Sequence, residues 1–228
     1  MLDSLYSLLQ FTDGLFPSGG FAHSFGLEAY AQSGLLKSRE DAFALIAYHL
    51  EAALAPCDGA AVALALEAAR LDDLKSLCRL DLTLDAMKVA RQFREASRQM
   101  GRQMLRVAVG CVEHPVVMDY SRALESEEAQ GHHAIVFGLV GACRGWEKRS
   151  AITAFLYSGA ALLTHAAVRL IPLGQRDGQW LLTALEPCVS RLTETALERG
   201  EDDLSSFEPA LEIRGMQHER FDGRMFRS

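Results

Sequence analysis

Few residues of this chain have the types and spacing that catalysis requires. Ser18 lies in the glycine-containing segment Phe16–Phe21, and His23 follows it closely. A serine beside a histidine could serve as an activated nucleophile. However, exposed nucleophilic serines of hydrolases usually lie in a GxSxG strand-to-helix turn, and this sequence has none. We therefore interpret Phe16–Phe21 as a turn whose glycines allow positive φ angles.

The remaining candidate ligands form no recognised metal or phosphate motif. His132 and His133 are adjacent, so on a helix they point in different directions and cannot chelate one ion as an i, i+4 pair would. We expect them to cap or hydrogen-bond the start of a helix. The sequence also contains no phosphate-binding GxxxxGK[ST], no dinucleotide-binding GxGxxG after a strand, and no HExxH. These observations predict a protein that is not an enzyme and needs no cofactor; a small metal-dependent hydrolase using Ser18, His23 and His132 is the alternative.

Composition limits the class of protein further. The formal net charge of −7 argues against nucleic-acid binding, which depends on neutralising phosphates. The cysteines are odd in number and have no close pairs, which predicts neither a disulfide framework nor a CxxC site and fits a reducing cytoplasm; they are Cys57, Cys78, Cys111, Cys143 and Cys188. The start Met1-Leu2-Asp3 lacks the basic region of a secretory signal. The apolar stretch from Ala151 to Val168 is interrupted by polar residues, so we expect a buried core helix and no membrane association.

Helical periodicity recurs throughout, and no segment shows sustained strand-like alternation. We predict an all-α, single-domain bundle of about eight to ten helices. Ser38 and Asp41 resemble a capping box that opens a helix, which Pro56 should end, and Asp58 should cap the helix that follows. The expected helices cover residues 2–13, 24–34, 38–54, 58–70, 83–112, 117–125, 133–145, 150–170 and 180–199.

Two apolar helices, 133–145 and 150–170, should pair as an antiparallel hairpin at the centre of the bundle. Ala134, Gly138 and Ala142 recur every fourth residue and would give a groove that admits another backbone. In the expected helix 83–112, Gly101 indicates close packing by a neighbouring element, since an interior glycine otherwise costs about 1 kcal/mol.

The same long helix separates two faces. Phe93, Ser97, Met100, Met104 and Val107 lie on one side, and five arginines lie on the other: Arg91, Arg94, Arg98, Arg102 and Arg106. Like charges at i, i+4 are mildly destabilising unless carboxylates lie against them. An acidic partner and an internal or solvated charge network explain this arginine stripe equally well.

The last segment, 205–228, combines apolar residues with arginines and reads as irregular. We predict a helical domain over 1–204 and a C-terminal arm over 205–228 that folds when it meets a partner. A disordered end is the alternative.

Several of these segments, taken together and in order, resemble the urease accessory protein UreF family. The resemblance is carried by DGLFPSGGFAHSFGLE (Asp13–Glu28), REASRQMGRQ (Arg94–Gln103), GHHAIVFGLVGA (Gly131–Ala142), RLIPLGQRDGQ (Arg169–Gln179) and the final RMFRS. It covers almost the whole chain.

The resemblance implies an all-α homodimer that binds UreD (called UreH in some systems), recruits the GTPase UreG with it, and assists nickel delivery to apo-urease. A minor alternative is that an arginine of the stripe accelerates GTP hydrolysis by UreG. The residues that the resemblance marks as partner-facing are Pro17, Ser18, Gly19, His23, Ser24, Glu28, Arg94, Arg98, Arg102, Arg214, Gln217, His218, Arg224, Met225, Phe226 and Ser228.

Overall fold

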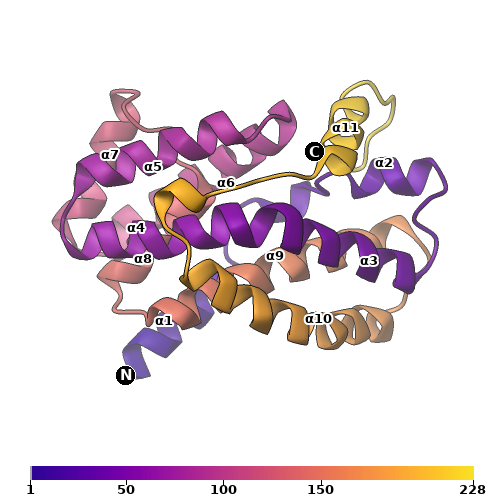
Figure 1. Cartoon of the computed structure of the whole chain (residues 1–228), viewed down its shortest axis with the longest axis horizontal. Helices are drawn as coiled ribbons and strands as arrows, with labels where there is room; N and C mark the ends of the chain where they lie inside the picture. Colours follow the sequence, from indigo (N-terminus) through magenta and orange to yellow (C-terminus); the bar gives the residue numbers. More distant parts are fainter. Residues whose placement is uncertain (1) are drawn as a thin grey trace.

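A computed structural model describes residues 2–228, and all regular structure in that range is helical. The α helices are α1 Leu2–Thr12, α2 Leu27–Gln32, α3 Arg39–His49, α4 Ala60–Arg70, α5 Leu74–Met87, α6 Arg91–Cys111, α7 Pro115–Glu125, α8 His133–Cys143, α9 Lys148–Leu170, α10 Gln175–Leu197 and α11 Pro209–His218. A π-helical segment, Leu50–Gly59, joins α3 to α4, and short 3-10 turns occupy Gly20–Ala22 and Glu201–Asp203. The predicted all-α single domain is confirmed (Figure 1).

The capping box at the start of α3 is present as predicted. The hydroxyl of Ser38 accepts a hydrogen bond from the Asp41 N–H at 3.1 Å, and the Asp41 carboxylate accepts one from the Ser38 N–H at 3.0 Å. The prediction that Pro56 ends this helix is wrong, because residues 39–70 form one continuous helical rod. The chain passes Pro56 in π-helical geometry, in which a missing N–H and the bulk of the ring are tolerated more easily than in an α helix. Asp58 is therefore buried inside the rod and does not cap α4.

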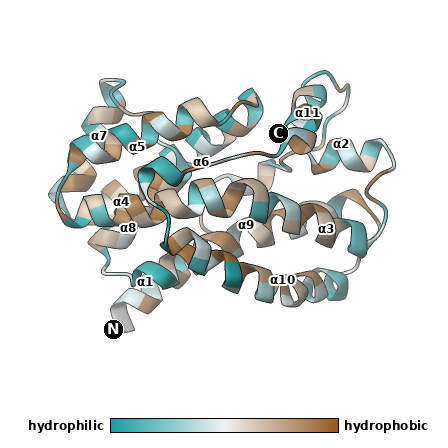
Figure 2. Cartoon of the chain, viewed as in Figure 1, coloured by the Kyte–Doolittle hydropathy of each residue, from teal (hydrophilic) through white to brown (hydrophobic). Residues whose placement is uncertain are grey.

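The core forms where α8 crosses α4 and α6. α8 is buried along nearly its whole length, and Figure 2 shows it beside α4. Gly138 permits this contact as predicted: a Cβ added there would lie 2.6 Å from the carbonyl oxygen of Val62 and 2.8 Å from the Cβ of Ala65. The expected pairing of α8 with α9 as a central hairpin is not the main contact, since α9 packs chiefly against α10.

The helix expected over 83–112 is in fact two helices. α5 ends at Met87 and α6 starts at Arg91, and Lys88 between them has non-helical backbone angles (φ −81°, ψ 88°). Gly101 lies on α6 where the loop before α8 crosses, and an added Cβ would lie 2.6 Å from the carbonyl carbon of His132. Close packing thus explains Gly101, as predicted.

Two helices are long and apolar enough to cross a membrane by length and composition alone, Arg39–Arg70 and Lys148–Leu170. Within their most apolar windows, 78% of the first and 50% of the second is buried inside the protein. Both therefore pack as core helices, which agrees with the expectation for Ala151–Val168.

The segment 205–228 is irregular at both ends, but α11 forms in its middle, a helix that the sequence did not predict. In Figure 1 the chain leaves the end of α10, crosses the face of the bundle in an extended run, and returns beside α2. The C-terminal segment thus lies against the bundle.

Candidate functional site

The end of the C-terminal segment is held by one buried carboxylate from α2. Glu28 is only 2% exposed and accepts hydrogen bonds from the N–H groups of Met225 (2.8 Å) and Phe226 (2.9 Å). It also lies 2.8 Å from His218 Nε2. Burial alone would raise the pKa of Glu28, but these hydrogen bonds outweigh it and lower the pKa. Glu28 is thus an ionised anchor for the segment.

A second set of contacts holds Ser228 against His23 and Ser24, which follow the 3-10 turn Gly20–Ala22. The carbonyl oxygen of Ser228 accepts hydrogen bonds from the N–H (2.6 Å) and the hydroxyl (2.7 Å) of Ser24. His23 Nδ1 lies 2.9 Å from the Ser228 hydroxyl. Burial, helped by nearby Arg227, lowers the pKa of His23 to about 4, so its ring is neutral at pH 7. The contacts made by Ser24 and His23 therefore add to the anchor that Glu28 provides.

Two glycines allow α11 to approach the bundle closely. Gly26 has φ +88° at the N-cap of α2, and a Cβ there would lie 3.1 Å from the carbonyl oxygen of Leu211. A Cβ on Gly215 would lie 2.7 Å from the Phe93 ring of α6. α11 is therefore seated in a groove between α2 and α6, with Leu211 fully buried.

The first part of the C-terminal segment is attached to the π-helical segment. Pro56 has no N–H to donate along the helix, and one carbonyl of the preceding turn, that of Ala52, accepts a hydrogen bond from the Phe207 N–H at 3.0 Å. Next to it, Glu208 lies 2.6 Å from His49 Nδ1, and both side chains are buried. Burial would lower the pKa of His49, but Glu208 raises it above the ordinary value. The π-helical segment and the start of the C-terminal segment thus satisfy each other's hydrogen-bonding groups.

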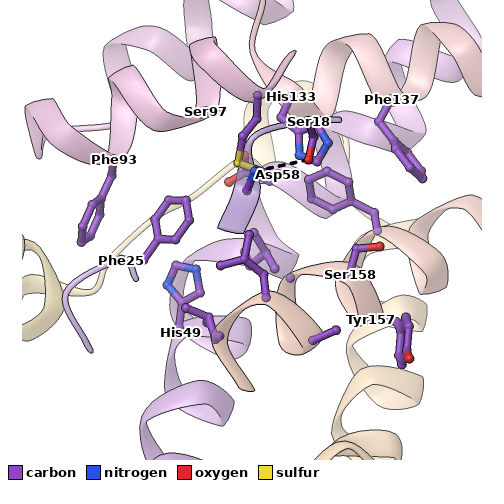
Figure 3. A pocket seen from close by; sticks show the side chains of 18 of the residues that line it. Ser18, Phe25, His49, Asp58, Phe93, Ser97, His133, Phe137, Tyr157 and Ser158 are labelled. Atoms are coloured by element: carbon purple, nitrogen blue, oxygen red, sulfur yellow. Dashed lines mark hydrogen bonds between the residues drawn. The ribbon is translucent and has the colours of Figure 1, made fainter. Parts of the chain in front are cut away.

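Beneath this segment lies a cavity of about 540 Å³. Figure 3 shows the rings of Phe25 and Phe93 on one side of it and Phe137 on another. Its polar lining includes the buried ion pair between Lys88 and Asp58, whose atoms Nζ and Oδ2 are 2.7 Å apart. The arrangement can hold a ligand with an apolar body and one charged group.

His133 also lines this cavity, and no hydrogen bond to its ring occurs among residues 2–228. Burial lowers its pKa to about 4, which leaves the ring neutral at pH 7. His132 has a different role at the start of α8. Its ring lies 3.0 Å from both Ser97 Oγ and Asp85 Oδ1, so the expected hydrogen-bonding role is present.

The structure brings together part of the residue set that the family resemblance marks. His23, Ser24 and Glu28 from the first block meet His218, Phe226 and Ser228 from the last, and all of these six are buried. The side chains of His23, Ser24 and Glu28 thus bind the chain's own C-terminal segment in this structure. Ser18 lines the cavity, and the side chains exposed to solvent are those of Pro17, Gln217, Arg224 and Met225, with Gly19 exposed beside them.

Every arginine in the stripe of α6 has a partner within the chain, and Arg91 pairs with Glu219 of the C-terminal segment at 2.9 Å. Arg98 forms an ion pair with Asp85, which also binds His132, so Arg98 is part of an internal network. Arg94 donates to the carbonyl of Lys88 at 2.7 Å, and Arg102 donates to that of Gln130 at 3.0 Å. Arg91, Arg102 and Arg106 remain exposed. Only these last three present the stripe to solvent.

The alternative hydrolase hypothesis finds no assembled site. Among residues 2–228, no group of three or more histidines, cysteines, aspartates or glutamates is placed to hold a metal ion. His23 binds Ser228, whereas His132 binds Ser97 and Asp85, so the two rings serve separate clusters. The geometry gives Ser18 no histidine partner, since no hydrogen bond joins it to one in the described range.

The cavity has a polar wall that was not predicted from the sequence; its residues are His49, Asp58, Lys88, Glu208 and Glu212. One signal was available: a proline and the polar residues His49, Glu51 and Asp58 interrupt an otherwise apolar helical run. The other three residues come from distant parts of the chain, and only the tertiary fold brings them to this place.

The chain is similar to known proteins along its whole length. The family model described as UreF matches residues 36–186. The urease accessory protein UreF of Bacillus sp. (strain TB-90) is 35% identical over 227 residues, covering 100% of both chains. The proteins of the same name from Actinobacillus pleuropneumoniae serotype 5b (strain L20) and serotype 3 (strain JL03) are each 34% identical, again over 100% of both chains. Both the family match and the full-length relatives show that this chain belongs to the UreF family of urease accessory proteins.

Proposed function

We propose that this chain promotes urease maturation as an assembly adaptor that performs no catalysis itself. In this role it binds UreD/UreH, and the two proteins together recruit the GTPase UreG. The assembly then assists the delivery of its cargo, nickel, to apo-urease. The family membership supports the general role, and the family resemblance supplies the partners. The same resemblance leads us to propose a homodimer that works in the cytoplasm.

The observation that carries the proposal is the outward face of the docked C-terminal segment. Its inner face packs against α2, α6 and the π-helical segment. Its outer face exposes apolar side chains, Ile213 (54%), Met216 (41%) and Met225 (54%), among the arginines 220, 224 and 227. Exposed methionines beside arginines are typical of protein interfaces. We therefore assign this outer face to UreD/UreH.

The buried anchors give the proposal a physical basis. A segment that is ordered before it meets a partner loses less conformational entropy on binding than a disordered one. Glu28, Ser24 and His23 hold the end of the arm in place. These three residues would thus serve partner binding indirectly, by shaping the surface that the partner contacts.

The exposed arginines of α6, Arg91, Arg102 and Arg106, form a second surface. Since their own partners leave them largely solvated, we propose that they contact an acidic surface within the same assembly. Charged rims of this kind mainly raise association rates and depend on salt.

The test is capture of UreD/UreH by a variant in which only the outer face of the arm is changed. Arg224→Glu with Met225→Asp alters two exposed side chains and leaves the backbone bonds to Glu28 possible. We expect at least about tenfold weaker capture, which corresponds to about 1.4 kcal/mol. Undiminished capture by a folded variant would contradict the assignment of this face.

A matched control is available on α7, at the opposite end of the bundle in Figure 1. Met118 is 45% exposed, and Arg122 has a side-chain exposure of 72%. Met118→Asp with Arg122→Glu makes the same chemical change there and should leave capture of UreD/UreH intact. Equal losses in both variants would show a nonspecific effect of charge.

A further inference from the structure

The cavity beneath the C-terminal segment has an unbalanced charge. On its polar wall, Lys88 pairs with Asp58 at 2.7 Å and His49 pairs with Glu208 at 2.6 Å. Glu212 of α11 also lines the cavity, but it has no ion pair and no side-chain hydrogen bond among residues 2–228. With both pairs ionised, two lining carboxylates have no ion pair in the described range: Glu212, which is partly buried, and Asp13, which is exposed.

The environment of Glu212 favours a cation. Burial, together with the nearby Glu208, raises the pKa of Glu212, so its negative charge is destabilised as the protein stands. A positively charged ligand group would remove that penalty, because a partly buried charge is costly mainly when it is unpaired. The cavity is thus better suited to a cation than to an anion.

Aromatic rings line the same cavity as this carboxylate. Gly215 follows Glu212 by three residues and therefore lies on the same side of α11. The Phe93 ring packs against Gly215, and the ring centroid of Phe25 is 5.4 Å from that of Phe93. Both rings line the cavity, as Figure 3 shows. Faces of aromatic rings attract organic ammonium groups.

The rest of the cavity is apolar and large enough for the body of such a ligand. Phe16, Phe137, Phe155 and Leu162 are among its lining residues. His133 adds a neutral ring with free nitrogens that can accept or donate one hydrogen bond. A volume of about 540 Å³ lies within the range of small-molecule sites.

We propose that this cavity binds a small organic ammonium ion, with its charged head between Glu212 and the rings of Phe25 and Phe93 and its apolar body against the inner phenyl rings. The proposal is independent of the partners with which the chain assembles. It predicts a ligand class, primary alkyl or arylalkyl amines that are protonated at neutral pH, which the cavity distinguishes from neutral molecules of the same shape.

The test is isothermal titration calorimetry of the full chain at pH 7.5 with 2-phenylethylamine and with its neutral analogue 2-phenylethanol. We expect the amine to bind at least about tenfold more tightly than the alcohol. The preference should disappear in Glu212→Gln, which keeps the shape of the side chain and removes its charge. It should persist in Glu219→Gln, a carboxylate of the same segment that pairs with Arg91 and does not line the cavity.

Equal affinities for amine and alcohol in the unaltered protein would overturn the proposal, as would no detectable binding of the amine. So would a preference that survives Glu212→Gln, because the amine would then bind elsewhere. Thermal melting of both variants checks that they are folded. If Glu212→Gln fails to fold, the comparison of amine with alcohol in the unaltered protein still supports or overturns the proposal.

Discussion

Replacing Glu28 by alanine should release the end of the C-terminal segment while the helical core stays folded. The carboxylate accepts two backbone hydrogen bonds, from Met225 at 2.8 Å and Phe226 at 2.9 Å. A hydrogen bond to a charged group contributes about 1.5–3 kcal/mol, so the pair accounts for about 3–6 kcal/mol of docking free energy. The lost contact with His218 adds to this. At about 1.4 kcal/mol for each factor of ten, the population of the released state should rise at least about 100-fold.

Hydrogen exchange followed by mass spectrometry measures this release directly. In Glu28→Ala, protection of the amides in residues 219–228 should fall by two orders of magnitude or more, while α4 and α8 keep their protection. Glu219→Ala is the matched control, because its carboxylate is 27% exposed and forms an ion pair with Arg91. Exposed pairs contribute about 0–1 kcal/mol, so protection in this control should change little.

Acid should reproduce the effect of the substitution. Because hydrogen bonds lower the pKa of Glu28 below its ordinary value of 4.5, its contribution is complete above pH 4.5 and is lost as the pH falls through the lower, folded-state pKa. Protection of residues 219–228 should therefore decrease below pH 4.5 in the unaltered protein and not in Glu28→Ala. Unchanged protection of these residues in Glu28→Ala at neutral pH would refute the reasoning.

Three further predictions concern the stability of the bundle, each measured by urea unfolding. Lys88→Met leaves the buried Asp58 unpaired and should cost about 3–5 kcal/mol; an unchanged midpoint would exclude a structural ion pair. Gly138→Ala should cost about 1–3 kcal/mol, because its Cβ would meet the α4 backbone, whereas Gly110→Ala meets nothing within 4 Å and should stabilise by up to about 1 kcal/mol; equal effects would contradict the packing argument. His133 has a pKa of about 4 in the folded protein and an ordinary value of 6.5, so unfolding takes up a proton between these values and stability falls as the pH drops. His133→Gln should reduce the loss between pH 6.5 and 5 by about 1.6 kcal/mol, and an equal loss in both proteins would show that His133 is not buried in its neutral form.

The sequence predicted those parts of the fold that depend on local pattern. The capping box at Ser38 and the close approach at Gly138 follow from spacing alone, and both are present. Pro56 misled the prediction, because a π-helical segment accommodates a proline that would end an α helix. The break at Lys88 was missed because no glycine or proline marks it, and the ion pair with Asp58 that holds it is a long-range contact.

The candidate site was predictable only in part. The block ending at Glu28 and the segment ending at Ser228 were both singled out, but nothing in the sequence indicated that they bind each other. Glu208 and Glu212 looked like ordinary charged residues of a polar tail, because their burial depends on the cavity beneath them. A helix as short as α11 has little stability of its own, so its existence depends on the groove between α2 and α6.

Because the π-helical segment Leu50–Gly59 sets the rotation of α4 relative to α3, the number of residues in this segment is constrained more strongly than their identities. In an α helix each residue turns the chain by roughly 100°. Deleting one residue near Pro56 would therefore rotate all of α4 and point Ala65 away from Gly138. This would hold even if the deleted residue had a small side chain. Relatives that differ here by substitution can keep the same core, but a chain shortened by one residue would need a different helix crossing.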